Sequence, residues 1–236
     1  MSNADRAQSF APVALDAVPT GPASASSKKE RRPTLRGVPD LVAAAVALPA
    51  GVLLSLRADG GLAAFSAAMF SFGLFCMLLT SGLYHCVTWS PARLAWMSRL
   101  DHAAIFLLIG ASYTPFCLAT DLPMGPHVLG VVWPCAAFGV IHCLFMEGAH
   151  RDVRAALYVL LGVAMVPATP WLARLLPGAA FALALLGGAS YILGALVYVR
   201  RWPNPSPRHF GYHEVFHLFV FAGAASHYAS IREVVT

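Results

Sequence analysis

The sequence predicts an all-α protein, a bundle of seven transmembrane helices, from its composition, the lengths of its apolar runs and the distribution of its charges. Of its 236 residues, 58% are hydrophobic and 11% are charged, whereas an average soluble domain has about 25% charged residues. A soluble chain of this length cannot bury so much apolar surface. The long charge-free runs instead match the roughly 20 apolar residues that a helix needs to cross a bilayer.

Seven runs of this kind lie between short polar segments. The first two are separated by Arg57, Asp59 and a pair of glycines, which favour a turn. In chain order, the runs are residues 38–56, 61–85, 100–119, 127–147, 154–173, 178–199 and 212–231. We expect kinks rather than breaks at the prolines inside these runs, because neighbouring helices in a membrane can satisfy the freed carbonyl groups. These prolines are Pro49, Pro115, Pro134 and Pro167.

The lysines and arginines predict the orientation of the bundle. Thirteen of the sixteen precede the first run or lie between runs two and three, four and five, and six and seven. Only Arg57, Arg174 and Arg232 fall on the other side. Because positive charges concentrate on the cytoplasmic side, we expect a cytoplasmic N-terminus and, after seven crossings, an external C-terminus. We expect the cell membrane (plasma or inner) as the location, and the basic charge balance requires no nucleic-acid partner.

Residues 1–32 differ from the rest of the chain. They are rich in Ala, Ser and Pro and then become basic. They contain no apolar core of the length that a cleavable signal peptide needs. We therefore expect a disordered, basic cytoplasmic tail at residues 1–32 and a membrane domain at residues 33–236.

Ionisable side chains near the ends of the apolar runs predict a metal site. His85 ends the second run, Asp101 begins the third, and His213 and His217 begin the seventh. With a cytoplasmic N-terminus, all four lie at the same cytoplasmic depth, and ionisable groups in a membrane mark functional sites by default. Imidazole is a preferred zinc ligand, and three histidines leave a fourth position open, as in catalytic sites. We therefore predict that His85, His213 and His217 bind Zn²⁺.

Local spacing adds two residues to this site. Ser81 stands four residues before His85, on the same helix face. Its hydroxyl either hydrogen-bonds a ligand, water or substrate carbonyl, or bonds back to its own helix. Asp101 and His102 point about 100° apart on a helix, so only one should face the site. We choose Asp101, because a carboxylate near zinc can orient water or act as a general base.

Residues 213–217 also read as H-E-x-x-H, the zincin signature in which the glutamate is the base. This short pattern often arises by chance, and a zincin needs its third ligand in a particular context. Glu214 either acts as the base or complements the dipole at the first turn of its helix. His227 lies ten residues after His217, about 15 Å along a helix, which is too far to bind the same ion.

Three blocks of the sequence together resemble the hemolysin III branch of the progestin and adipoQ receptor family in their order and spacing. They are Ser81-x-x-x-His85, Asp101 at the head of DHAAIFLLIGASYTPF, and His213-x-x-x-His217 followed by Ala-x-x-His-Tyr. The resemblance implies seven helices around a zinc ion held by His85, His213 and His217, with Ser81 and Asp101 close by. It also implies a zinc-dependent hydrolase of lipid amides, because the adiponectin receptors of this superfamily resemble alkaline ceramidases.

The chain departs from the family pattern at two places. Bacterial members usually carry a histidine early in the first helix, and GVPDLVAAAVALPAG at residues 37–51 has none. This leaves open whether the first helix contributes to the site. The receptors carry glutamine where this chain has Glu214, which leaves Asp101 and Glu214 as alternative bases.

The sequence as a whole predicts an integral membrane enzyme that uses zinc to hydrolyse an amide (ceramide-like) or ester bond of a lipid from the bilayer. The alternative is a non-enzymatic sensor or receptor with a structural zinc ion. A coordination position open to water would favour the enzyme, and four protein ligands around the zinc ion would favour the sensor. An intramembrane zinc protease, which rests on H-E-x-x-H alone, and a pore-forming hemolysin rank below both. The sequence indicates no particular protein partner.

Overall fold

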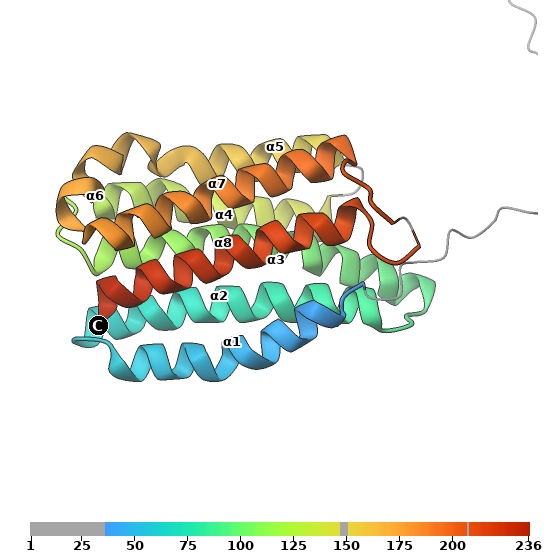
Figure 1. Cartoon of the computed structure of the whole chain (residues 1–236), viewed down its shortest axis with the longest axis horizontal. Helices are drawn as coiled ribbons and strands as arrows, with labels where there is room; N and C mark the ends of the chain where they lie inside the picture. Colours follow the sequence, from blue (N-terminus) through green and yellow to red (C-terminus); the bar gives the residue numbers. More distant parts are fainter. Residues whose placement is uncertain (1–35, 147–150, 207) are drawn as a thin grey trace, which may run out of the picture. The chain divides into compact units, whose positions relative to one another are not determined.

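The computed structural model describes residues 36–146, 151–206 and 208–236, and these residues form a helical bundle (Figure 1). The fold is all-α with seven helical segments in this part of the chain, as the apolar runs predict. The tail predicted at residues 1–32 lies outside the described residues. The elements are α1 (Val38–Arg57), α2 (Gly61–Cys86), α3 (Pro91–Leu118), α4 (Gly125–Phe145), α5 (Arg151–Gly162) with η1 (Val163–Ala168) and α6 (Thr169–Leu175), α7 (Gly178–Arg200) and α8 (Tyr212–Val235).

Within the described ranges, six segments are long and apolar enough to cross a membrane: α1, α2, α3, α4, the combined α5–η1–α6 and α7. Their outward faces carry exposed apolar side chains such as Val46 and Leu160. The seventh segment, α8, has 24 residues, and a helix of that length is about 36 Å long. It is less apolar than the others because it contains residues such as His213, Glu214 and His217, which face the interior of the bundle.

Helix α3 begins at Pro91, well before the predicted start at residue 100. Proline is favoured in the first turn of a helix, where its missing N–H would have no partner. The first turns of α3 also carry Arg93 and Arg99, so a search for apolar runs does not include them. Arg99 donates a hydrogen bond to the carbonyl of Leu144 near the end of α4, at 3.0 Å, which attaches this polar extension to the bundle.

The fifth segment loses its α-helical pattern at η1, which contains Pro167. This is more than the kink predicted there, since six residues adopt 3₁₀ geometry. Tyr113 of α3 compensates for the lost helical hydrogen bonds: its hydroxyl reaches the carbonyls of Leu161 at 2.8 Å and Gly162 at 2.7 Å. The backbone N–H of Met165 donates to the same hydroxyl at 3.0 Å. A neighbouring helix thus satisfies the freed backbone groups, as a membrane environment requires.

Helices α1 to α4 pack against one another in chain order, and α8 lies along α7 and also contacts α1, α2 and α3 (Figure 1). Because successive helices run in opposite directions, the end of α2 and the starts of α1, α3 and α8 meet at one end of the bundle. This arrangement brings residues from four helices together, although they are far apart in the sequence.

Candidate metal centre

Three histidines converge where α2 ends and α8 begins. Nε2 of His213 lies 3.1 Å from Nε2 of His85 and 3.0 Å from Nε2 of His217. One ligand atom from each residue lies within 4.8 Å of the others. His213 and His217 share a face of α8 because they are four residues apart. The structure therefore brings the three predicted ligands together.

Two of the nitrogen separations in this cluster are close to those of a tetrahedral metal site. Nitrogens about 2.0–2.1 Å from zinc at tetrahedral angles lie about 3.3–3.4 Å apart, and the two Nε2–Nε2 separations at His213 are slightly shorter, 3.0 and 3.1 Å. Each Nε2 of a neutral imidazole either donates or accepts a hydrogen bond, whereas a cation can accept a lone pair from all three Nε2 atoms at once. The three-histidine group can therefore hold a metal ion.

Asp40 of α1 supports one of these histidines. Its Oδ1 lies 2.8 Å from Nδ1 of His217, although the pair is not aligned as an ideal hydrogen bond. Asp40 is 2% exposed, so burial would be costly without this polar neighbour. A carboxylate on the second nitrogen of a metal-binding imidazole fixes its tautomer and orientation. The sequence analysis did not assign Asp40, and the available signal was a carboxylate at the start of an apolar run.

Gly37 allows α1 to approach the cluster. It is the residue before α1 and has a φ of 85°, a left-handed conformation that favours glycine. A β-carbon at this position would lie 2.6 Å from Cβ of His85. Any side chain here would displace α1 from α2. Gly37 therefore sets the distance at which Asp40 can reach His217.

Ser81 and Asp101 lie beside the histidines. Ser81 is 2% exposed, and its hydroxyl is next to the Asp101 carboxyl group without an ideally aligned hydrogen bond. Neighbouring Thr80, by contrast, donates to the carbonyl of Cys76 at 2.8 Å. Asp101 is also close enough to His217 and Asp40 for electrostatic interaction. The hydroxyl of Ser81 thus faces the site instead of its own helix.

Both ring nitrogens of His102 are engaged in contacts outside the cluster. Its Nδ1 lies 2.5 Å from the carbonyl oxygen of Ser98, and its Nε2 lies 3.5 Å from Nη2 of Arg154. Its own carbonyl accepts a hydrogen bond from Tyr158 at 3.0 Å. These contacts explain why Asp101, and not the adjacent histidine, approaches the three imidazoles.

Both carboxylate oxygens of Glu214 are engaged in structural contacts. Oε1 accepts a hydrogen bond from Nε of Arg36 at 2.7 Å, and Oε2 accepts one from the backbone N–H of Gly211 at 2.8 Å. The second contact caps the N-terminus of α8, where a negative charge also complements the helix dipole. Glu214 thus holds the start of α8 in place beside the cluster.

A cavity of about 600 Å³ opens from the histidine cluster into the bundle. Its lining is mostly apolar and comes from α2, α3, α5, η1, α6, α7 and α8. Ser81, Asp101 and the three histidines lie at one end, and Leu172, Phe181 and His227 belong to its other part. Cavities of this size hold drug-sized or lipid-sized ligands, with a few polar groups to orient them.

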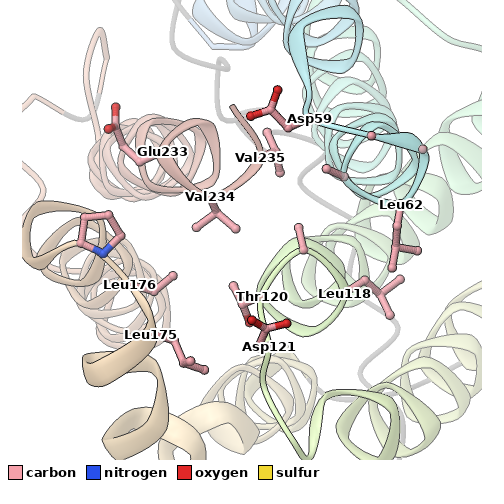
Figure 2. Close-up of a pocket in the computed structure, with 15 residues that line it drawn as sticks. Asp59, Leu62, Leu118, Thr120, Asp121, Leu175, Leu176, Glu233, Val234 and Val235 are labelled. Atoms are coloured by element: carbon pink, nitrogen blue, oxygen red, sulfur yellow. The ribbon is translucent and has the colours of Figure 1, made fainter.

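A second hollow, of about 570 Å³, lies where α2 begins and α3 and α8 end, at the opposite ends of these helices from the histidines (Figure 2). Its charged groups are Asp59, Asp121 and Glu233. Its lining residues offer carboxylates but no imidazole, so it lacks the ligand set of the first site.

Comparison with known proteins identifies the family of the chain. The family model described as "Haemolysin-III related" matches residues 29–228. The chain belongs to this family. It is 31% identical to Hemolysin-3 of Bacillus cereus, over 78% of this chain and 83% of that protein. It is 26% identical to the human monocyte to macrophage differentiation factor, over 78% of this chain and 76% of that protein.

A plant protein extends the haemolysin-III relationship towards the adiponectin receptors. The rice heptahelical transmembrane protein ADIPOR3 is 34% identical over 66% of this chain and 43% of that protein. These matches confirm the resemblance that the three sequence blocks indicate. Together with the six apolar spans, membership of the haemolysin-III related family establishes a multi-pass membrane protein with a possible three-histidine metal site.

Proposed function

We propose that this protein is a zinc-dependent hydrolase that cleaves an amide (ceramide-like) or ester bond of a membrane lipid. The observation that carries the proposal is the position of the three imidazoles and two further polar side chains at one end of a mostly apolar cavity. Such a cavity suits an acyl chain, and the polar end suits the bond to be cleaved. When bound, a zinc ion supplies Lewis-acid chemistry and acidifies water.

The protein's own residues have distinct roles in this proposal. His85, His213 and His217 hold the metal ion, and Asp40 fixes the ring of His217 through Nδ1. Asp101 orients the attacking water and accepts its proton at a carboxylate oxygen. The Ser81 hydroxyl, next to Asp101, donates a hydrogen bond to the substrate carbonyl oxygen as negative charge develops there.

Glu214 is a weaker candidate for the base than Asp101. Arg36 and Gly211 already engage its two oxygens, so abstraction of a proton would break contacts that cap α8. The same contacts argue against a zincin-type protease, because that mechanism assigns the base to this glutamate. The mostly apolar cavity lining likewise favours a lipid site over a water-filled pore.

One observation favours a second function, a sensor or receptor with a structural metal ion. The Asp101 carboxyl group lies close to His217, and a carboxylate oxygen is a possible fourth zinc ligand. A closed set of four protein ligands would leave no position for water or substrate. The coordination of the loaded protein therefore separates the two functions.

The test is turnover by the purified, zinc-loaded protein in lipid nanodiscs. We expect release of a fatty acid from members of a panel of ceramides, N-acyl amines and lipid esters. A chelator that removes the metal should abolish this release, and added zinc should restore it. Asp101→Asn should keep its zinc, as expected when solvent and not this carboxylate occupies the fourth position. Absence of turnover across the panel, with Asp101 as a fourth ligand, would establish the sensor instead.

A further inference from the structure

His227 of α8 and Tyr191 of α7 form a polar pair inside the apolar cavity. Both side chains line it, and their ring centroids are 5.4 Å apart. His227 lies ten residues after His217, so it is about 15 Å further along the helix axis. The pair is therefore separate from the histidine cluster, in a part of the cavity that a long ligand can reach.

Two polar atoms of this pair have no partner among the residues that the structure describes. They are Nδ1 of His227 and the hydroxyl of Tyr191, and each exposes less than 1 Å². A buried polar group without a partner is costly, by about 1–3 kcal/mol. A bound water or a polar group of a ligand commonly satisfies such atoms.

The hydrogen-bonding pattern of the pair is complementary to a hydroxyl group. Nε2 of His227 lies 3.2 Å from the carbonyl oxygen of Ala184, and a carbonyl can only accept, so Nε2 carries the proton in this assignment. Nδ1 is then an acceptor, whereas the Tyr191 hydroxyl can donate and accept. A ligand hydroxyl can donate to the first and accept from the second.

Two glycines make room for the pair in a reciprocal way. A β-carbon on Gly187 of α7 would overlap the ring of His227, and one on Gly223 of α8 would lie 2.8 Å from Cε1 of Tyr191. Each glycine stands four residues before the polar aromatic residue of its own helix, so each helix provides one polar ring and the gap for the other. This construction positions both side chains through backbone packing.

We propose that His227 and Tyr191 form a second binding subsite, which recognises a hydroxyl group on the chain of the bound lipid. The inference rests on the proposed lipid hydrolase, and it names the class of substrate: an amide or ester whose chain carries a hydroxyl about 15 Å from the cleaved bond. Between the two polar ends, apolar residues such as Ile109, Val163 and Val220 line the cavity, where an unsubstituted chain fits.

Equilibrium binding tests this subsite without requiring turnover. The zinc-loaded, full-length protein carrying Asp101→Asn, which should bind the amides without hydrolysing them, is titrated in nanodiscs with three fatty amides of equal length, and displacement of a fluorescent fatty amide is measured. One amide has a hydroxyl about 15 Å from the carbonyl, one has it next to the carbonyl, and one has none. We expect the first to bind on the order of tenfold more tightly than the other two, because it gains two hydrogen bonds.

The variants assign that preference to the pair. Tyr191→Phe removes only the hydroxyl and should reduce the preference to about threefold or less, and His227→Leu should have a similar effect. Tyr228→Phe is the matched control, because its hydroxyl donates to the Ala50 carbonyl at 2.9 Å and it does not line the cavity. This control should keep the full preference.

Two results would overturn the subsite. One is equal affinity of the Asp101→Asn protein, with Tyr191 and His227 intact, for all three amides, as expected if the pair binds only water. The other is an unchanged preference in a folded Tyr191→Phe or His227→Leu protein. Either can occur while the unsubstituted amide is still hydrolysed, which leaves the hydrolase intact. Conversely, a clear preference without turnover would retain the subsite and refute the hydrolase.

Discussion

Oδ1 of Asp40 lies 2.8 Å from Nδ1 of His217, and this contact links the first helix of the bundle to the last. The same imidazole lies 3.0 Å from His213 through its other nitrogen. A carboxylate at Nδ1 places the proton on that nitrogen and leaves Nε2 with a lone pair directed at the cluster. Helix α1 thus supports the candidate metal centre through Asp40, which contacts His217 and is not one of the three imidazoles.

Replacement of Asp40 should weaken zinc binding. Asp40→Ala leaves His217 without its orienting partner, and we expect the zinc affinity to fall by about 10–100-fold. Asp40→Asn keeps an acceptor oxygen and should lose less. Competition with a chromophoric chelator measures the affinity, and Asp59→Asn, in the loop before α2, is the control. Equal chelator midpoints for the unmodified and Asp40→Ala proteins would refute this role.

Replacement of the ligands themselves should have a larger effect. His85→Ala, His213→Ala and His217→Ala each remove one of the three imidazoles that supply nearly all of the binding, so each purified variant should contain much less zinc. His127→Ala, on the exposed surface of α4, should retain the normal content. Elemental analysis after gel filtration provides the measurement, and full zinc content in any of the three variants would remove that residue from the ligand set.

Local spacing and chain direction were sufficient to predict the histidine cluster. The separation of four between His213 and His217 puts them on one helix face, and the alternating direction of the helices brings His85 to the same end. Chain direction also places Asp40, near the start of the first run, at this end of the bundle, but it does not show that the carboxylate contacts His217, because that contact depends on how the side chains pack. The first helix has a carboxylate at the site in place of a histidine, and the family pattern does not include this carboxylate.

Other features depend on side-chain partners that no periodicity reveals. The H-E-x-x-H pattern cannot show that Arg36 and Gly211 engage Glu214. The 3₁₀ segment at η1 depends on Tyr113 of α3, which satisfies its backbone groups. The extra turns of α3 before residue 100 are polar, and a search for apolar runs excludes them. The cavity exists only once α3, α5, α7 and α8 are assembled.

The charge distribution makes a prediction about topology. The end of the bundle with the histidines also carries basic side chains, including Arg36, Arg93 and Arg99, whereas the opposite end carries Asp59 and Asp121. We therefore expect the metal centre near the cytoplasm and the C-terminus outside.

Fusions of alkaline phosphatase and of a fluorescent protein after Thr236 measure this orientation. Alkaline phosphatase should be active, because it works only outside the cytoplasm, and the fluorescent protein should not be fluorescent there. Fusions truncated after Arg200 provide the internal control and should give the opposite pattern. If the fluorescent protein is fluorescent both after Thr236 and after Arg200, the two positions lie on the cytoplasmic side and α8 does not cross the membrane.

Replacement of Asp101 tests whether its carboxylate acts as a general base or as a fourth metal ligand. Asp101→Asn keeps the size of the side chain but removes its charge and basicity, so zinc should stay bound while turnover of a short-chain ceramide falls by roughly 10²-fold or more. Loss of zinc together with turnover would instead identify Asp101 as a fourth ligand, and therefore favour the sensor.

Glu214→Gln is the paired comparison for Asp101→Asn. It weakens the contact with Arg36 and the cap on α8, so the melting temperature should fall, because hydrogen bonds to charged groups are worth about 1.5–3 kcal/mol. Turnover per bound zinc should stay close to that of the unmodified protein, since both oxygens of Glu214 already have structural partners. A 10²-fold loss of turnover with normal stability in this variant, and none in Asp101→Asn, would move the base to Glu214.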